Sequence, residues 1–300
     1  MINLLYVLHC RYSLIFSPMI QYMYYYKGFY MKLKVLFVIF NIVLILLLFT
    51  VFFLPLFYAD GSFMREFWKT NWFFGPVFLI LILFVNIMFL KNRLLINYIE
   101  SEDWSSLASL LEKRIYTKKR ITYKNSLLLA ESLLLLGDFT SMNKFCDFLK
   151  DNQPKYVSKL GPKFAAAKMI SGNYQDVFEF SSSLPVLKTT ASEWIVFYSA
   201  LSLQMMKNYE KSAALFTKVS DSAKNPLIKC LSTYFVVNVL QTYSQLTEEE
   251  IKEKALLLRS RINKNYTYES WKAYTESEKQ EIHVMILTKI IDDVTSWLFF

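Results

Sequence analysis

The chain has 300 residues, of which 54% are apolar, and its formal net charge is +9. Six Gly and seven Pro leave few turn formers between long apolar runs, so the composition favours a helical and partly membrane-embedded protein. Residues 1–93 contain 8 Lys and Arg against 2 Asp and Glu, whereas residues 94–300 contain 26 against 23. Most of the excess charge therefore lies beside the apolar runs. The soluble part lacks the concentrated basic face that nucleic-acid binding requires.

The first 30 residues leave two interpretations open. Their apolar stretches enclose His9, Cys10 and Arg11, which makes a poor membrane span, and the sequence from Met31 (MKLK) has the form of a bacterial start. Residues 1–30 are therefore either a mis-assigned N-terminal extension or an extra span of poor quality.

Two apolar runs predict a transmembrane hairpin within residues 31–93. The first run, residues 35–58, is interrupted mainly by Asn41 and Pro55, and the second covers residues 72–90. A transmembrane helix needs roughly 20 apolar residues. The first run is too long for a signal-peptide core and no small-x-small cleavage site follows it, so we expect an uncleaved anchor.

The charges that flank the two spans predict their orientation. Lys27, Lys32 and Lys34 precede the first span, and Lys91 and Arg93 follow the second, whereas the charges of the loop between them cancel. By the positive-inside rule both flanks are cytoplasmic and the loop is outside. We therefore expect a multi-pass protein of a bacterial inner membrane with a cytoplasmic C-terminal domain.

A 35-residue repeat follows the spans. An Asx residue precedes an aromatic residue at four positions 35 residues apart: Asp103-Trp104, Asp138-Phe139, Asn173-Tyr174 and Asn208-Tyr209. A small residue that lets helices pack closely stands nine residues before the last three aromatics: Ala130, Ala165 and Ala200. Each unit is predicted to be a helix, a tight turn, a second helix and a break. A fixed period of this length is typical of a solenoid.

This pattern resembles the tetratricopeptide repeat, a pair of helices that recurs every 34 residues. The matching residues of the three units are Leu129, Ala130, Gly137, Phe139 and Pro154, then Phe164, Ala165, Gly172 and Tyr174, then Ala200, Tyr209 and Phe216. Met142, Cys146 and Lys168 depart from the family's small and aromatic positions. The resemblance covers about residues 94–244 and implies an all-α fold, in which two transmembrane helices precede an α-solenoid of antiparallel helix pairs.

The junction between the spans and the repeats is predicted to be helical. Residues 94–100 would continue the second span as the first helix of an incomplete repeat, and residues 104–114 would form the second helix. This layout is similar to that of HemY-type bacterial membrane proteins. The following segment, residues 113–124, contains six basic residues. It is interpreted either as a solvated linker after a helix end or as a contact with anionic lipid headgroups.

Residues 245–300 lie outside the 35-residue register and are predicted to cap the repeats. Capping boxes of the form Thr-x-x-Glu at Thr190, Thr247 and Thr275 predict helices that start near residues 191, 248 and 276. The last is expected to be one long helix, residues 275–297. Its apolar stripe is Ile282, Ile286, Ile290, Val294 and Trp297. This tail would either pack on the repeats as a lid or join the core of a partner.

The resemblance also implies a groove lined by the first helix of each unit. It places there the candidate partner-binding residues Lys124, Glu131, Lys159, Trp194, Phe197, Leu201 and Gln204, together with Ala166. Trp194, Phe197 and Leu201 share one helical face. Two interpretations stay open: the stripe is core against the following helices, or it receives an amphipathic helix of a partner.

Patterns of catalytic or metal-binding residues are lacking. His9 and His283 are the two His, and the three Cys (Cys10, Cys146 and Cys230) have no metal-like spacing and fit reduced, buried thiols. Asn41 and Asn86 are expected to bond between the spans rather than to line a transport path. The leading hypothesis is therefore a membrane-anchored scaffold without cofactors whose solenoid binds a protein partner. The alternatives are a non-catalytic subunit of a membrane transporter or envelope-synthesis complex, and an autonomous enzyme.

Overall fold

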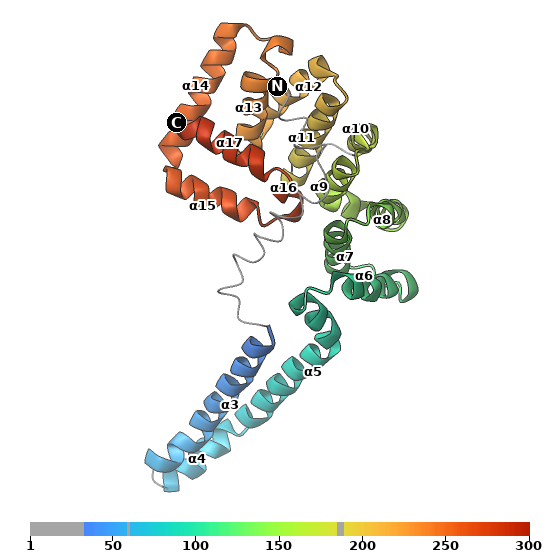
Figure 1. Cartoon of the computed structure of the whole chain (residues 1–300). Helices are drawn as coiled ribbons and strands as arrows, with labels where there is room; N and C mark the ends of the chain where they lie inside the picture. Colours follow the sequence, from blue (N-terminus) through green and yellow to red (C-terminus); the bar gives the residue numbers. More distant parts are fainter. Residues whose placement is uncertain (1–32, 59–60, 185–188) are drawn as a thin grey trace. The chain divides into compact units, whose positions relative to one another are not determined.

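The structure is a computed structural model of the chain, and it describes residues 33–58, 61–184 and 189–300. All regular elements in these ranges are helices, so the predicted all-α class is confirmed (Figure 1). The described residues divide into two compact units, residues 33–110 and residues 111–300. The predictions for residues 1–30 lie outside the described residues.

A helical hairpin forms most of the first unit. Helices α3 (Leu33–Tyr58) and α5 (Phe74–Glu100) pack against each other. The rings of Phe37 and Phe89 stack with centroids 3.8 Å apart. Asn86 Nδ2 donates a hydrogen bond to Asn41 Oδ1 at 2.8 Å. The predicted bond between the two helices is therefore confirmed.

The segment between these helices was predicted to be a loop, and that prediction is wrong. It forms helix α4 (Gly61–Asn71). Its sequence repeats at helical spacing, because Phe63 and Phe67 are four residues apart, as are Arg65 and Lys69. Residues four apart share a face of a helix, so the sequence carries a helical pattern that the net charge of the segment conceals.

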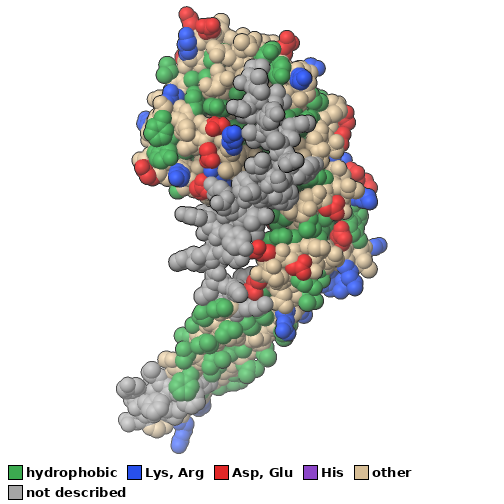
Figure 2. All heavy atoms as spheres, in the orientation of Figure 1, with side chains coloured by type: hydrophobic (Ala, Val, Ile, Leu, Met, Phe, Trp, Pro, Cys, Tyr) green, Lys and Arg blue, Asp and Glu red, His purple; other side chains and the backbone are tan. Residues whose placement is uncertain are grey.

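Apolar side chains cover the outside of the hairpin. Ile80, Phe84 and Leu90 are more than 60% exposed, and hydrophobic side chains dominate the visible face of these helices (Figure 2). Of the described residues, α5 alone is both long and apolar enough to cross a membrane, by length and composition. The described apolar stretch of α3, Phe37–Thr50, is shorter. An exposed apolar surface of this extent marks a site of membrane or protein contact.

Helices recur along the chain after α5 at the predicted interval. Four helices begin at the four predicted aromatics: α6 (Trp104–Glu112), α8 (Phe139–Asn152), α10 (Tyr174–Ser183) and α12 (Tyr209–Ser222). The last three each follow a first helix: α7 (Tyr123–Leu136), α9 (Pro154–Ile170) and α11 (Thr190–Met205). Helix α9 contacts α7, α8, α10 and α11, so neighbouring pairs share one continuous core. The arrangement is compatible with a helical repeat fold.

The turn within each pair has one geometry. A residue with positive φ stands two positions before each aromatic: Glu102 (56°), Gly137 (67°), Gly172 (79°) and Lys207 (62°). In the α7–α8 turn, the N–H of Asp138 donates to the carbonyl of Leu133 and that of Gly137 to the carbonyl of Leu134. This pair of bonds is the Schellman motif, and it satisfies the last carbonyls of the first helix.

The Asx residue of the turn then starts the next helix at two of the four positions. Asp138 Oδ1 accepts a hydrogen bond from the N–H of Ser141 at 3.0 Å, and Asp103 Oδ1 does the same for Ser106. These bonds lower the pKa of both carboxyls. Asn173 and Asn208 occupy the same position without a side-chain cap. The Asx-aromatic pattern thus marks where each second helix begins.

The small residues predicted to lie at close helix crossings are buried. Ala130, Ala165 and Ala200 are fully buried. A methyl group added at Gly161 on α9 would clash with Ile195 on α11, which shows how closely these two helices approach. Packing rather than backbone conformation therefore requires small residues here.

Helices of varied length follow α12. They are α13 (Pro226–Tyr234), the π-helix η3 (Phe235–Val239), the 3-10 helix η4 (Gln241–Tyr243), α14 (Glu248–Asn265), α15 (Tyr268–Glu278), α16 (Ile282–Met285) and α17 (Thr288–Phe299). The capping box predicted at Thr247 is present: Thr247 Oγ1 accepts a hydrogen bond from the N–H of Glu250, and Glu250 Oε2 accepts one from the N–H of Thr247. At α11 the cap is Thr189 rather than Thr190.

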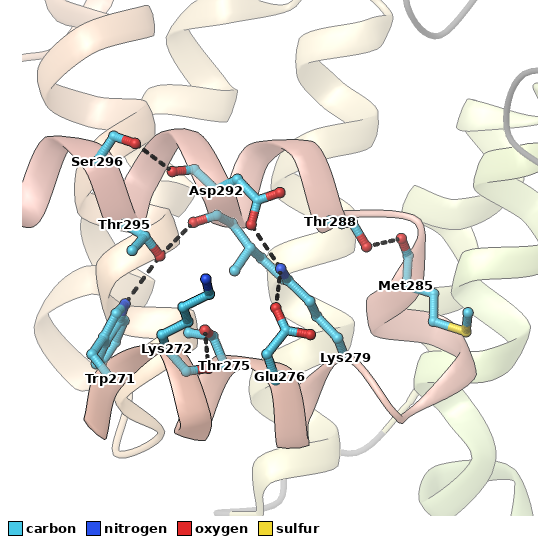
Figure 3. A network of polar contacts seen from close by, with 11 residues as sticks. Trp271, Lys272, Thr275, Glu276, Lys279, Met285, Thr288, Asp292, Thr295 and Ser296 are labelled. Carbon is cyan, nitrogen blue, oxygen red and sulfur yellow. Dashed lines mark hydrogen bonds and ion pairs between the residues drawn. The ribbon is translucent and has the colours of Figure 1, made fainter. Parts of the chain in front are cut away.

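The predicted long helix over residues 275–297 is wrong, because the chain folds back between α15 and α17. Lys279 Nζ donates to Glu276 Oε1 at 2.9 Å and to Asp292 Oδ1 at 2.7 Å, and Trp271 Nε1 donates to Thr295 Oγ1 at 3.1 Å (Figure 3). Thr275 lies inside α15 and does not cap a helix.

The fold-back also changes which residues of the tail are buried. The buried stripe is Val284, Leu287, Ile291, Val294 and Leu298, which shares one residue with the predicted stripe. Helix α17 contacts α13 and α14, and α16 contacts α7 and α9. Of the two interpretations of the tail, the structure supports packing on the helix pairs.

Replacing Ala165 by Leu should overpack the α9–α11 crossing and lower the free energy of unfolding by about 1–3 kcal/mol. The exposed Ala214 on α12 provides the control, because Leu is a good helix former and has room there. Thermal unfolding of the full chain in detergent micelles, followed by circular dichroism, measures both. Equal melting temperatures for the two variants would show that the crossing is not tight.

Candidate functional site

The predicted groove residues do not form one surface. Lys124 and Lys159 are exposed, Glu131 and Gln204 are half-buried, and Trp194, Phe197 and Leu201 are at most 4% exposed. The set therefore divides into an exposed basic part and a buried aromatic part.

The aromatic part is core, which corrects its assignment to a partner-binding surface. The ring of Phe197 lies 5.5 Å from that of Phe216 on α12 and 6.1 Å from that of Phe235 in η3. Trp194 meets His283 of α16 edge-to-face at 5.3 Å. The following helices and the C-terminal tail together cover this stripe. Sequence spacing showed one apolar face but not what lies against it.

A polar cluster around the buried Lys163 joins the tail to the first helices of two pairs. Lys163 Nζ lies 2.8 Å from Glu281 Oε2 and 3.4 Å from Glu131 Oε1, and its side chain is 8% exposed. Burial raises the pKa of Glu131, and Lys163 opposes this effect. The Tyr198 hydroxyl donates to the backbone carbonyl of His283 at 2.5 Å. These contacts hold α16 against α7, α9 and α11.

His283 sits in this cluster without a hydrogen bond to either ring nitrogen among the described residues. Its Nδ1 lies 3.9 Å from Glu281 Oε2, and the residue is 5% exposed. Burial and the nearby charge of Lys163 lower the pKa of His283 to about 3. The imidazole is therefore neutral at physiological pH, and its surroundings suit a structural role rather than proton transfer to a substrate.

A pocket of about 830 Å³ lies beside the exposed basic part. Its lining comes from α7, α8, α9 and the segments that flank residues 185–188, which lie outside the described residues: Tyr123, Lys150, Pro154, Lys155, Val157, Ser158, Lys159, Ser183, Leu184, Thr189 and Ala191. Three lysines and no carboxylate stand among these residues. The other lining residues are mostly apolar, so the pocket combines an apolar surface with positive charge.

The three lysines differ in the contacts that their ammonium groups make. Lys150 Nζ donates to Asp147 Oδ1 at 2.9 Å, which raises the pKa of Lys150. Lys159 Nζ lies 5.3 Å from the centroid of the Tyr123 ring, within the range of a cation–π contact. Lys155 is exposed and forms no ion pair with a described residue. Two of the three ammonium groups are thus free to pair with an anionic ligand.

The predicted basic segment is also exposed. Its exposed cations are Lys113, Lys118, Lys119, Arg120 and Lys124. It begins with the π-helix η2 (Lys113–Thr117), in which Ile115 is fully buried and anchors the turn. Burial and the nearby Glu112 raise the pKa of Tyr116 to about 12. Both interpretations of this segment, a solvated linker and a lipid contact, remain predictions.

Neither thiol that the structure describes has reactive surroundings. Cys146 and Cys230 are buried and free, and burial raises the pKa of Cys146 to about 11 and that of Cys230 still further. A thiol that stays protonated is a poor nucleophile and a poor metal ligand. In the described part of the chain, no three His, Cys, Asp or Glu residues are placed to hold a metal ion.

Comparison with known proteins gives a family without a recorded activity. A family model described as "Uncharacterised Treponema protein" matches residues 141–300. An uncharacterized protein of Treponema pallidum (strain Nichols) is 30% identical over 287 residues, which cover 91% of this chain and 90% of the relative. The chain belongs to this family. No solved structure matches it. The family match includes the pocket lysines and His283.

Sequence reasoning found Lys159 of the pocket but missed Lys150 and Lys155. A usable signal was present, because Lys155 and Lys159 are four residues apart and share a face of α9 just after Pro154. Lys150 comes from the preceding helix, and no periodicity within one helix reveals it.

His283 should make the protein less stable in acid. Because its pKa in the folded state lies below the unfolded value of about 6.5, its contribution to stability is complete above that pH and is lost as the pH falls toward 3. Lowering the pH from 7.5 to 5.5 should cost wild type about 1.4 kcal/mol more than His283→Phe, which cannot titrate. Urea unfolding of both proteins at the two pH values measures the difference.

The charged groups around His283 are Lys163, Glu131 and Glu281, and all three remain in the variant. Their own titration therefore contributes to both proteins and largely cancels in the comparison. An equal loss of stability in the two proteins would contradict a neutral, buried His283.

Proposed function

We propose that this protein is a membrane-anchored scaffold, in which α3 and α5 both span the bilayer and tetratricopeptide-like helix pairs bind a protein partner. The observation that carries the proposal is the pairing, in one chain, of an apolar hairpin with a basic pocket on the helix pairs. The apolar outer surface of α3 and α5 supports membrane insertion. The bond from Asn86 Nδ2 to Asn41 Oδ1 supports insertion as a pair, because it joins a polar donor and a polar acceptor of the two helices away from water.

The pocket indicates the chemistry of the partner segment. Lys155 and Lys159 would pair with carboxylates, while Pro154, Val157 and Leu184 would contact apolar side chains. An acidic, amphipathic segment of a protein satisfies both requirements. The likeness to tetratricopeptide repeats supports this assignment, since binding a peptide along the helix pairs is the function that the resemblance implies. The alternative of a non-catalytic subunit of a transporter or envelope-synthesis complex uses the same pocket and differs in the partner.

The proposed topology places α4 outside the cytoplasm and the helix pairs inside it. In a chain with Cys10→Ser, a membrane-impermeant maleimide added to spheroplasts should label Lys69→Cys in α4 and spare Lys218→Cys in α12. Both positions are exposed, so the comparison reports sidedness rather than burial. After permeabilisation both should react. Labelling of Lys218→Cys in intact spheroplasts would reverse the orientation.

The pocket should cross-link to a partner that the outer face of α12 does not reach. A photoreactive phenylalanine at Lys155 should give one discrete adduct in cells, and the same group at Lys218 should not. Reversing two pocket charges with Lys150→Glu and Lys159→Glu should lower the adduct yield about tenfold, the effect of losing about 1.4 kcal/mol. An unchanged adduct yield at an unchanged melting temperature would show that the pocket lysines do not bind the partner.

A further inference from the structure

One face of α14 is exposed and is not explained by the proposed scaffold. The opposite face of this helix, with Ile251, Leu258 and Ile262, is buried, and α14 contacts α13, η3 and α17 (Figure 1). The exposed face lines a shallow hollow of about 500 Å³ formed by Glu249, Lys252, Glu253, Leu256, Leu257 and Ser260. Leu256 is 67% exposed and Leu257 61% exposed. Two adjacent leucines are thus presented to solvent on a helix whose core face is already filled.

The charges on this face are arranged about the two leucines. Helix α14 has 18 residues, from Glu248 to Asn265, so its midpoint falls between Leu256 and Leu257. The exposed side chains before the midpoint include Glu248, Glu249, Lys252 and Glu253. Those after it include Arg261 and Lys264, which lie four and seven residues beyond Leu257 and so flank its side of the face. The face is therefore largely acidic at one end, apolar in the middle and basic at the other end.

A surface of this kind is complementary to itself. A twofold axis through the midpoint brings a second α14 antiparallel to the first, so that the acidic end of each copy faces the basic end of the other. At 1.5 Å per residue, Glu249 and Lys264 each lie about 11 Å from the midpoint, on opposite sides, and would come level across the axis. Glu253 and Arg261 lie about 5 and 7 Å from it and would also meet.

We propose that two copies of this chain associate through α14, with Leu256 and Leu257 of both copies packed at the twofold axis. Glu249 of one copy faces Lys264 of the other, and Glu253 faces Arg261. Lys252 is the one unfavourable group, because it lies about 7 Å from the midpoint and is level with Arg261 of the other copy. The charge pattern thus selects a second copy over a uniformly acidic or basic partner.

The size of the surface sets the conditions for the test. A stable complex typically buries roughly 1,200–2,000 Å² in total, and one helix face buries less. The dimer should therefore be weak for a protein that diffuses freely. The full chain in its native membranes is therefore the proper sample, because anchoring two copies in one bilayer raises their effective concentration.

Cross-linking at the axis tests the proposal. In a chain with Cys10→Ser, Leu257→Cys should form a covalent dimer with a short bismaleimide, because the two copies of residue 257 meet near the axis. Ser260→Cys keeps both leucines and should react with a longer reagent. Lys218→Cys, exposed on α12, is the control and should stay monomeric. Absence of a dimer at both α14 positions, or equal reaction at Lys218→Cys, would overturn the proposal.

Charge substitutions separate self-association from other contacts. With Ser260→Cys as the reporter, Glu253→Arg should lower the dimer yield about tenfold, since each substitution changes two symmetric charge pairs. Adding Arg261→Glu should restore it, and Lys252→Glu alone should increase it. No rescue by the double variant, or an adduct to a different protein in place of the dimer, would show that α14 does not pair with itself. These outcomes are independent of the pocket.

Discussion

The left-handed residue in each turn is the constraint on which the helix pairs depend. It reverses the chain direction within two residues and, through the Schellman bonds, satisfies the carbonyls that the first helix leaves open. Gly137 and Gly172 adopt this conformation at little cost, whereas Glu102 and Lys207 do so against the preference of residues with a Cβ. Tolerating that cost indicates that the reversal itself, rather than the identity of the residue, is required at each 35-residue step.

The two units meet different requirements from these helices. In the hairpin, apolar side chains point outward and a single amide pair points inward, which suits an environment without water. In the helix pairs, the apolar side chains point inward, and charges gather at two surfaces, the pocket and α14. The scaffold proposed above would use the first arrangement for its anchor and the second for its partner.

The local parts of the fold could be predicted from the sequence, and the long-range parts could not. The starts of α8, α10 and α12 follow from residues within two positions of each turn, so spacing alone located them. The break between α15 and α17 depends on Lys279 pairing with Asp292, thirteen residues later, which no helical periodicity reports. The burial of Trp194 depends on His283, almost ninety residues away. The pocket combines side chains from several helices, so the sequence showed only its contribution from α9.

The cluster of Lys163, Glu131 and Glu281 has a consequence for the order in which the chain is made. Lys163 is buried, and one of its two partners, Glu281, directly precedes α16, close to the C-terminus. When the ribosome has synthesised the helix pairs, Lys163 is therefore present but its second partner, Glu281, is not. Because Glu281 is 57% exposed, water screens this pair in part, and its loss costs less than the loss of one partner of a fully buried pair. A chain that stopped before residue 281 would retain the helix pairs, and its Lys163 would keep the longer contact with Glu131.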